Sequence, residues 1–202
     1  MAPQLEVLTV GHSNHTIERF IELLHLHRVT AVADLRSAPY SQMHTQFNRE
    51  PVTAALKREG ITYSFLGREL GGRPADKTCY ENGRVQYWKV AATPIFRSGT
   101  NRVLAGATNY RIALMCAERE PLECHRALLV APELEKAGIS VLHVHADGTI
   151  ESHPDAMSRL LDLYRLPEED LFRSRSELIE EACYRQQERV AFAEKPLPQV
   201  VR

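Results

Sequence analysis

The segment Cys124-His125-Arg126 places a thiol, an imidazole and a guanidinium at the predicted start of a helix. Free backbone N–H groups at a helix N-terminus stabilise an anion, so this position favours a Cys124 thiolate and allows Arg126 to hold a phosphate or carboxylate. Cys116 and Glu118, shortly before it, add a second thiol and a carboxylate. The candidate catalytic residues are Cys124, His12, Glu118 and Cys116.

The spacing of these groups does not match a protein-phosphatase loop, because Arg126 lies two positions after Cys124 and ten after Cys116. Two other interpretations stay open. Either cysteine can pack as a small apolar residue, or the sulfurs can bind a metal ion. The candidate metal ligands would be Cys116, Cys124, His12 and His153, although no compact CxxC or HxxxH pair supports them.

Four arginines lie at or after the ends of predicted strands, beside serines and the glycines of the segment ELGGRP. Guanidinium groups and glycine-exposed backbone amides bind phosphate oxygens well, whereas a surface ion pair is the ordinary alternative for any single arginine. The candidate anion-binding or substrate-binding residues are Ser13, Asp34, Arg36, Ser41, Arg68, Gly71, Gly72, Arg73, His125 and Arg126.

Short apolar runs alternate with amphipathic segments over the first 150 residues, which predicts an α/β fold with an open, mostly parallel sheet flanked by helices. In such sheets ligands bind beyond the carboxyl ends of the strands, where the candidate residues fall. The predicted strands are 5–10, 29–35, 61–66, 111–116 and 139–145. The predicted helices include 16–28, 48–60, a pair across 86–106 interrupted near Pro94 and Gly99, and one after Arg126 that Pro132 should kink.

Two segments differ from this alternation. Residues 67–84 show no periodicity, which predicts a long ordered loop of functional importance. Residues 154–202 are charged and helical, and Ser174 and Glu177 form a candidate capping box. We therefore predict an α/β domain over 1–153 and a helical C-terminal extension over 154–202, packed on that domain or on a second subunit. A homodimer through these helices is one expected arrangement.

The chain of 202 residues has a formal net charge of −1, which argues against a protein coated in basic charge. The charge is uneven: residues 1–126 carry 16 Lys and Arg against 12 Asp and Glu, whereas residues 127–202 carry 9 against 14. Local anion binding is therefore still open. The sequence contains no apolar run long enough for a membrane helix and no leader pattern, so we expect a cytoplasmic protein with free thiols and no membrane partner.

The sequence resembles a bacterial and archaeal family, domain of unknown function 488. The matching segments are TVGHS (9–13), DLRSAPYS (34–41) with QFN (46–48), YSFLGRELGGRP (63–74), LMCAEREPLECHR (114–126) and HVHADGTIESH (143–153), in the family's order. Leu35 stands where the family usually has valine. The resemblance implies an α/β fold and one shared site formed by the candidate polar residues, and it implies no substrate or cofactor.

Three functions are compatible with these features. The first is an enzyme acting on a phosphate-bearing substrate, a nucleotide or nucleic acid, with Arg36, Arg68 and Arg126 holding the anion. In it Cys124 is a nucleophile or redox-active thiol, and His12 or Glu118 moves protons. The second is a non-catalytic nucleotide-binding or nucleic-acid-binding module. The third is a metal-dependent enzyme that uses Cys116, Cys124 and a histidine.

Overall fold

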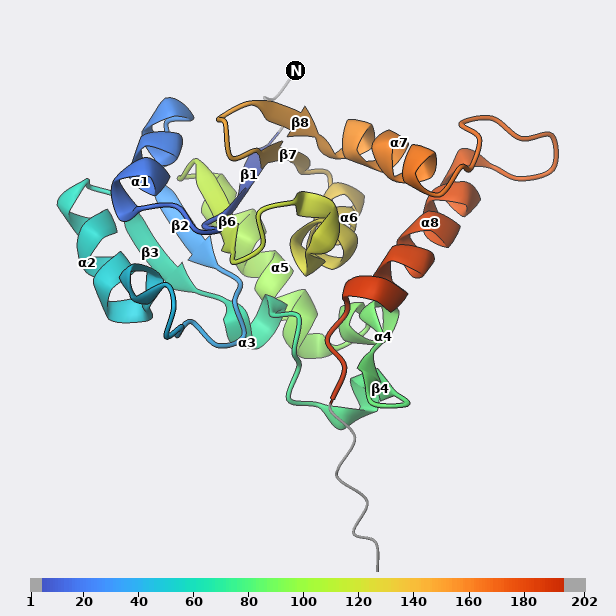
Figure 1. Cartoon of the computed structure of the whole chain (residues 1–202), viewed down its shortest axis with the longest axis horizontal. Helices are drawn as coiled ribbons and strands as arrows, with labels where there is room; N and C mark the ends of the chain where they lie inside the picture. Colours follow the sequence, from blue (N-terminus) through green and yellow to red (C-terminus); the bar gives the residue numbers. More distant parts are fainter. Residues whose placement is uncertain (1–4, 195–202) are drawn as a thin grey trace, which may run out of the picture.

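Five apolar runs of the sequence and one further strand form a six-stranded sheet whose order is β3-β2-β6-β1-β7-β8. The computed structural model describes residues 5–194 of the chain (Figure 1). The strands are β1 (Glu6–Gly11), β2 (Ala31–Asp34), β3 (Thr62–Phe65), β6 (Ile112–Cys116), β7 (Ser140–Val144) and β8 (Ile150–Ser152). The first five are parallel, and β8 pairs antiparallel with β7. The predicted α/β class is confirmed.

Helices cover both faces of this sheet (Figure 1). They are α1 (Ile17–Leu26), α2 (Arg49–Arg58), α3 (Gly67–Leu70), α4 (Tyr87–Ala91), α5 (Pro94–Ala107), α6 (Ala131–Lys136), α7 (His153–Leu163) and α8 (Arg175–Val190). Successive strand residues point to opposite faces. Leu8 and Met115 accordingly pack with α1 and α2, whereas Val7 and Leu114 pack in the core that α5 to α8 share.

The topology brings three strand ends together. Strand β6 lies between β1 and β2, with Gly11 opposite Cys116 and Asp34 opposite Met115. Because all three strands are parallel, their carboxyl ends open on the same edge of the sheet. The loops that follow Gly11, Asp34 and Cys116 therefore start side by side.

Some local expectations are wrong. Gly99 does not interrupt α5, which runs through it. Gly99 lies against α3, and a Cβ there would lie 2.8 Å from Leu70. Residues 67–84 are not a single loop: they contain α3, a 3-10 turn η2 (Lys77–Cys79) and a hairpin of β4 (Tyr80–Glu81) and β5 (Arg84–Val85). Strand β8 was not expected. Pro132 lies in the first turn of α6, after a π-helical turn η4 (Arg126–Val130), so the expected break is a change of helix type.

The C-terminal helices lie against the rest of the chain (Figure 1). Ser174 caps α8 together with Glu177 in a capping box, as the sequence predicts. Gln186 on α8 donates a 2.8 Å hydrogen bond to the Leu122 carbonyl, and Gln187 accepts one from the Tyr87 backbone at 3.0 Å. The domain division at residue 153 and the second subunit stay predictions, and residues 1–4 and 195–202 of those segments lie outside the described range. Within residues 5–194, no helix is both long and apolar enough to span a membrane.

Candidate functional site

The segment that presents Cys124 leaves the end of β6 and turns back through a 3-10 turn, η3 (Pro121–Glu123). The turn is specified locally. The Glu120 carboxylate accepts a 3.1 Å hydrogen bond from the Leu122 backbone, Pro121 occupies the first turn, and the Cys124 backbone donates to the Pro121 carbonyl at 3.1 Å. Cys124 therefore sits at a fixed point between η3 and η4.

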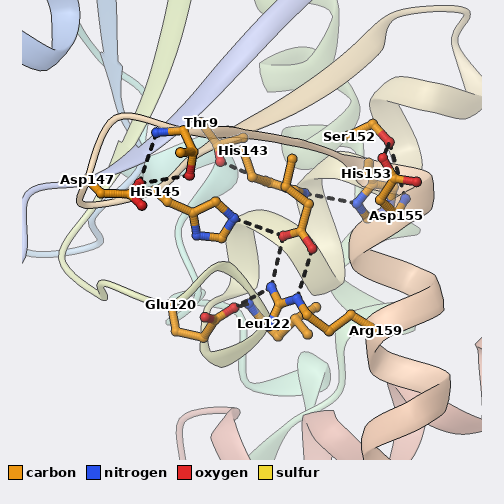
Figure 2. Close-up of polar contacts among 12 residues, drawn as sticks. Thr9, Glu120, Leu122, His143, His145, Asp147, Ser152, His153, Asp155 and Arg159 are labelled. Atoms are coloured by element: carbon orange, nitrogen blue, oxygen red, sulfur yellow. Dashed lines mark hydrogen bonds and ion pairs between the residues drawn. The ribbon is translucent and has the colours of Figure 1, made fainter.

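Distant elements brace the same turn (Figure 2). Arg159 on α7 donates to Glu120 at 2.8 Å and binds both carboxyl oxygens of Glu151 on β8, each at 2.8 Å. Glu151 also lies 3.1 Å from His145 Nε2. Figure 2 shows Arg159, Glu120 and His145 within this group of contacts, so the end of the sheet supports the loop that carries the thiol.

Four of the candidate residues form one cluster around the Cys124 sulfur. Its Sγ lies 3.0 Å from a Glu118 carboxyl oxygen and 3.6 Å from His125 Nδ1, and it accepts a 3.5 Å hydrogen bond from the Arg126 backbone N–H. The Cys116 sulfur lies 3.8 Å from His125 Nε2. A nucleophile, a carboxyl group and an imidazole are thus within contact distance, as covalent catalysis requires.

The surroundings of Cys124 favour its thiolate. Burial raises the pKa of the thiol, but a hydrogen bond from the Cys116 thiol and the positive charges of His125 and Arg126 outweigh burial and hold the pKa well below its usual value. Burial, and then the hydrogen bond that it donates, raise the pKa of Cys116. Burial, the largest single influence, lowers the pKa of His125, but the Cys124 charge, the hydrogen bond to Cys124 and the Glu118 charge together outweigh it, so the net shift is upward. These shifts favour a thiolate at Cys124 and a protonated imidazole at His125, and they disfavour ionisation of Cys116.

Glu118 is poised to exchange a proton near neutral pH. The residue keeps an exposed surface, but the protein packed around its carboxyl group and then the negative charge of Cys124 raise its pKa to about 7. A group with such a pKa can donate and accept protons at the pH of most cells. Glu118 is accordingly the acid or base that the geometry offers beside the sulfur.

Arg126 is not placed to hold a substrate anion. The residue is fully buried, and its two terminal nitrogens donate to the main-chain carbonyls of Glu118 at 2.6 Å and Arg119 at 3.0 Å. Its Nε has no hydrogen-bond partner among the described residues. The expected anion ligand is instead an internal tie that fixes the 118–119 backbone and places a positive charge behind Cys124.

Most of the donor groups of Arg36 are already used in hydrogen bonds within the protein. It binds the Asp34 carboxylate through two nitrogens, at 2.9 and 2.6 Å, and donates to the Phe47 carbonyl at 2.8 Å. The Tyr63 hydroxyl donates to the same carboxylate at 2.8 Å. Asp34 is therefore fully engaged in orienting Arg36, which keeps only part of its donor capacity for a ligand.

His12 lies in an environment that favours its neutral form. Burial, the largest influence, lowers its pKa to about 4. Its Nδ1 lies 2.9 Å from the Ser13 carbonyl and its Nε2 lies 3.2 Å from an Arg36 nitrogen. Since the carbonyl can only accept and the guanidinium can only donate, Nδ1 carries the proton and Nε2 accepts. The predicted proton transfer by His12 would require Arg36 to move away.

A cavity of about 430 Å³ opens beside Cys124. Gly72 lines this cavity, and a Cβ at this position would lie 3.0 Å from the His125 ring. The Arg73 guanidinium, also in the lining, lies 4.6 Å from the centre of the Phe192 ring. The lining includes Arg36, Ser37, Tyr40, Gly72, Arg73, Tyr87, Glu118, Glu123, Cys124, His125, Val190 and Phe192.

Several predicted residues lie elsewhere. Ser41 accepts from two backbone N–H groups of its own turn, Ser13 bonds to the neighbouring Asn14, and Gly71 packs against Ser37. Arg68 lines a separate hollow. These positions do not belong to the group that surrounds Cys124.

Of the four predicted metal ligands, the structure brings together the two cysteines but neither His12 nor His153. The two cysteine sulfurs and one His125 nitrogen lie within 4.8 Å of one another, and they are the group of described residues best placed to hold an ion. His12 is tied to Arg36, and His153 is bonded through Nδ1 to His143 at 3.1 Å (Figure 2). The histidine of the set is therefore His125.

Phe192 was missed. It follows α8 and reaches the cavity only because α8 runs back along the domain to the β4–β5 hairpin, where the Phe192 carbonyl accepts a 3.0 Å hydrogen bond from Val85. No periodicity or motif near residue 192 signals this contact.

The family comparison covers the part of the chain that contains the cluster. The sequence model described as Domain of unknown function DUF488 matches residues 16–131, which include Cys116, Glu118, Cys124, His125 and Arg126. This chain belongs to that family. The match leaves out His12 and the segment around His153. Searches of curated proteins and of solved structures gave no match.

Proposed function

We propose that this member of the domain of unknown function 488 family is an enzyme that uses the Cys124 thiolate as a nucleophile on a phosphate-bearing substrate. The observation that carries the proposal is the contact of the Cys124 sulfur with Glu118 at 3.0 Å and with His125 at 3.6 Å, on the wall of a cavity of about 430 Å³. That volume falls in the range of small-molecule sites.

The residues support a nucleophilic displacement in two steps. The Cys124 sulfur attacks the electrophilic atom and forms a covalent bond as the bond to the leaving group breaks, and the protonated Glu118 carboxyl gives its proton to the leaving group. A water molecule then attacks the covalent intermediate, Glu118 takes the proton from that water, and the thiolate leaves. The net reaction transfers the group to water and restores both residues.

The positive charges near the thiol support an anionic substrate. The raised pKa of His125 favours a positive charge beside the sulfur, and Arg73 and Arg36 line the same cavity, together with the carboxyl groups of Glu118 and Glu123. Guanidinium groups suit phosphate oxygens. In this arrangement the phosphate lies toward Arg73 and the electrophilic atom toward Cys124.

The test uses alkylation and turnover together. Cys124 is buried but lines the cavity, and its thiolate is favoured, so we expect iodoacetamide to modify it ahead of the half-buried Cys183, with a midpoint pH below that of an ordinary thiol near 8.5. Nucleotides or phosphate esters that bind the cavity should slow the reaction. Over a panel of such compounds, Cys124→Ser should abolish turnover and keep the fold, whereas the matched variant Cys183→Ser should retain it.

Two results would contradict the proposal. Alkylation of Cys124 that is no faster than that of Cys183, with no protection by any phosphate compound, would remove the thiolate from the function. Binding of a nucleotide that Cys124→Ser leaves unchanged, with no turnover by the unaltered protein, would favour the binding module.

A second candidate function is a metal-dependent enzyme, favoured by the proximity of Cys116, Cys124 and His125. Two sulfurs and one imidazole would suit Zn²⁺, which in catalytic sites has three protein ligands and activates a bound water molecule. Metal analysis of the purified protein separates the two candidates. Stoichiometric zinc, lost on Cys116→Ser, with Cys124 protected from alkylation until a chelator is added, would support the metal centre instead of the free thiolate.

A further inference from the structure

A second hollow, of about 460 Å³, lies at the edge of the sheet beside β3. It receives side chains from the start of α2, from β3, from α3 and from the middle of α5. None of the Cys124 cluster lines it. Arg68, which the sequence predicts to be an anion ligand, lines this hollow and not the cavity beside Cys124.

Three arginines and one glutamate line this hollow, so its charge is positive. Arg102 forms an ion pair with Glu69, whose side chain is 18% exposed, and the pair uses the one carboxylate of the hollow. Arg49 and Arg68 are exposed, and neither forms an ion pair with another residue of the described chain. Two guanidinium groups from different helices are therefore available to solvent on the same hollow.

The wall between them is fixed. The Arg49 guanidinium lies 5.0 Å from the centre of the Phe65 ring, which is a cation–π distance. Tyr63, also in the wall, donates to Asp34, and the charge of Asp34 is already taken by Arg36. Asp34 thus holds the wall in place without cancelling the positive charge that faces outward.

We propose that the hollow formed by Arg49, Phe65, Arg68 and Arg102 binds the phosphodiester backbone of single-stranded nucleic acid. A free phosphate ion is usually held by convergent donors that include backbone amides. Here the donors are exposed side chains from separate helices, an arrangement in which each guanidinium can take a different phosphate of a chain. The Arg49 guanidinium, backed by Phe65, offers a flat face on which a base can stack.

The test is a binding assay with a fluorescein-labelled thymidine oligonucleotide of about 16 nucleotides, followed by anisotropy between about 50 and 200 mM salt. We expect Arg49→Ala with Arg68→Ala to weaken binding about tenfold or more at the lower salt concentration. The slope of log affinity against log salt should fall by about 1.4, since each single-strand phosphate contact contributes about 0.7.

The matched control is Arg58→Ala with Arg97→Ala, which removes the same charge from exposed positions on α2 and α5 that line other hollows. This control should bind like the unaltered protein. Equal losses in both double variants would overturn the proposal, because binding would then follow net charge alone. An absence of oligonucleotide binding, or binding of only inorganic phosphate or mononucleotides, would also overturn it.

The proposal stands apart from the chemistry of Cys124. Cys124→Ser should leave oligonucleotide binding unchanged, and the double variant of Arg49 and Arg68 should leave the alkylation profile of Cys124 unchanged. The experiments can therefore refute the role of Cys124 without refuting nucleic-acid binding by the hollow, and they can refute nucleic-acid binding without refuting the role of Cys124.

Discussion

Replacing Arg126 with methionine tests whether this buried arginine holds the backbone at Glu118 and Arg119 in place or binds substrate. Methionine fills a similar volume but removes both charged hydrogen bonds, at 2.6 Å to the Glu118 carbonyl and 3.0 Å to the Arg119 carbonyl. A carbonyl left without a donor costs up to about 1–3 kcal/mol. Removing the guanidinium also removes the cost of burying its charge, which offsets part of that loss.

We therefore expect Arg126→Met to lower the free energy of unfolding by about 3 kcal/mol, a large share of the about 5–15 kcal/mol of a typical domain. In urea the midpoint should fall by about 1–2 M. The variant also removes a positive charge that lowers the pKa of Cys124, so the midpoint of the alkylation profile should move to higher pH. Arg119→Met is the matched control, because Arg119 is exposed and its side chain forms no hydrogen bond within residues 5–194.

The refuting result is specific. An unchanged urea midpoint together with an unchanged alkylation midpoint would show that the two carbonyl contacts contribute neither stability nor electrostatics. If phosphate compounds stabilise the unaltered protein and Arg126→Met loses only that effect, Arg126 is the anion ligand that the sequence predicted.

Two further predictions concern the same loop. A Cβ at Gly11 would lie 1.9 Å from the Glu118 carbonyl oxygen and 3.1 Å from an Arg126 nitrogen, so Gly11→Ala should cost about 1–3 kcal/mol in urea unfolding and slow alkylation. Gly106→Ala, whose Cβ would meet only a flexible side-chain end at 3.0 Å, should do neither, and equal effects would contradict the steric argument. The folded state raises the pKa of Glu118 from 4.5 to about 7, so it binds the proton more tightly than the unfolded chain does. The contribution of Glu118 to stability should therefore fall as pH rises across that interval, and Glu118→Gln should remove this component from unfolding curves measured at several pH values; identical pH profiles would show that the shift is absent.

Features that depend on neighbouring residues were predictable. The apolar runs become the five parallel strands because burial on both faces of the sheet requires them, and Ser174 caps α8 because its partner Glu177 is only three residues away. The sequence also placed Cys116, Glu118 and Cys124 near one another, since strand ends and short loops leave little freedom. Strand β8 and the hairpin inside 67–84 were missed because segments of two or three residues carry no measurable period.

The sequence by itself determined the α/β fold, the edge of the sheet where the polar residues gather, and the presence of a cysteine at the start of a helical segment. Only the tertiary structure decided which way the side chains turn. Arg126 points inward to two carbonyls, Arg68 opens on a different hollow, and Phe192 arrives from the far end of the chain. Phe192 depends on a partner in a distant part of the chain, Val85, whereas the inward direction of Arg126 depends on how the turn between β6 and η4 packs, and no local pattern encodes either.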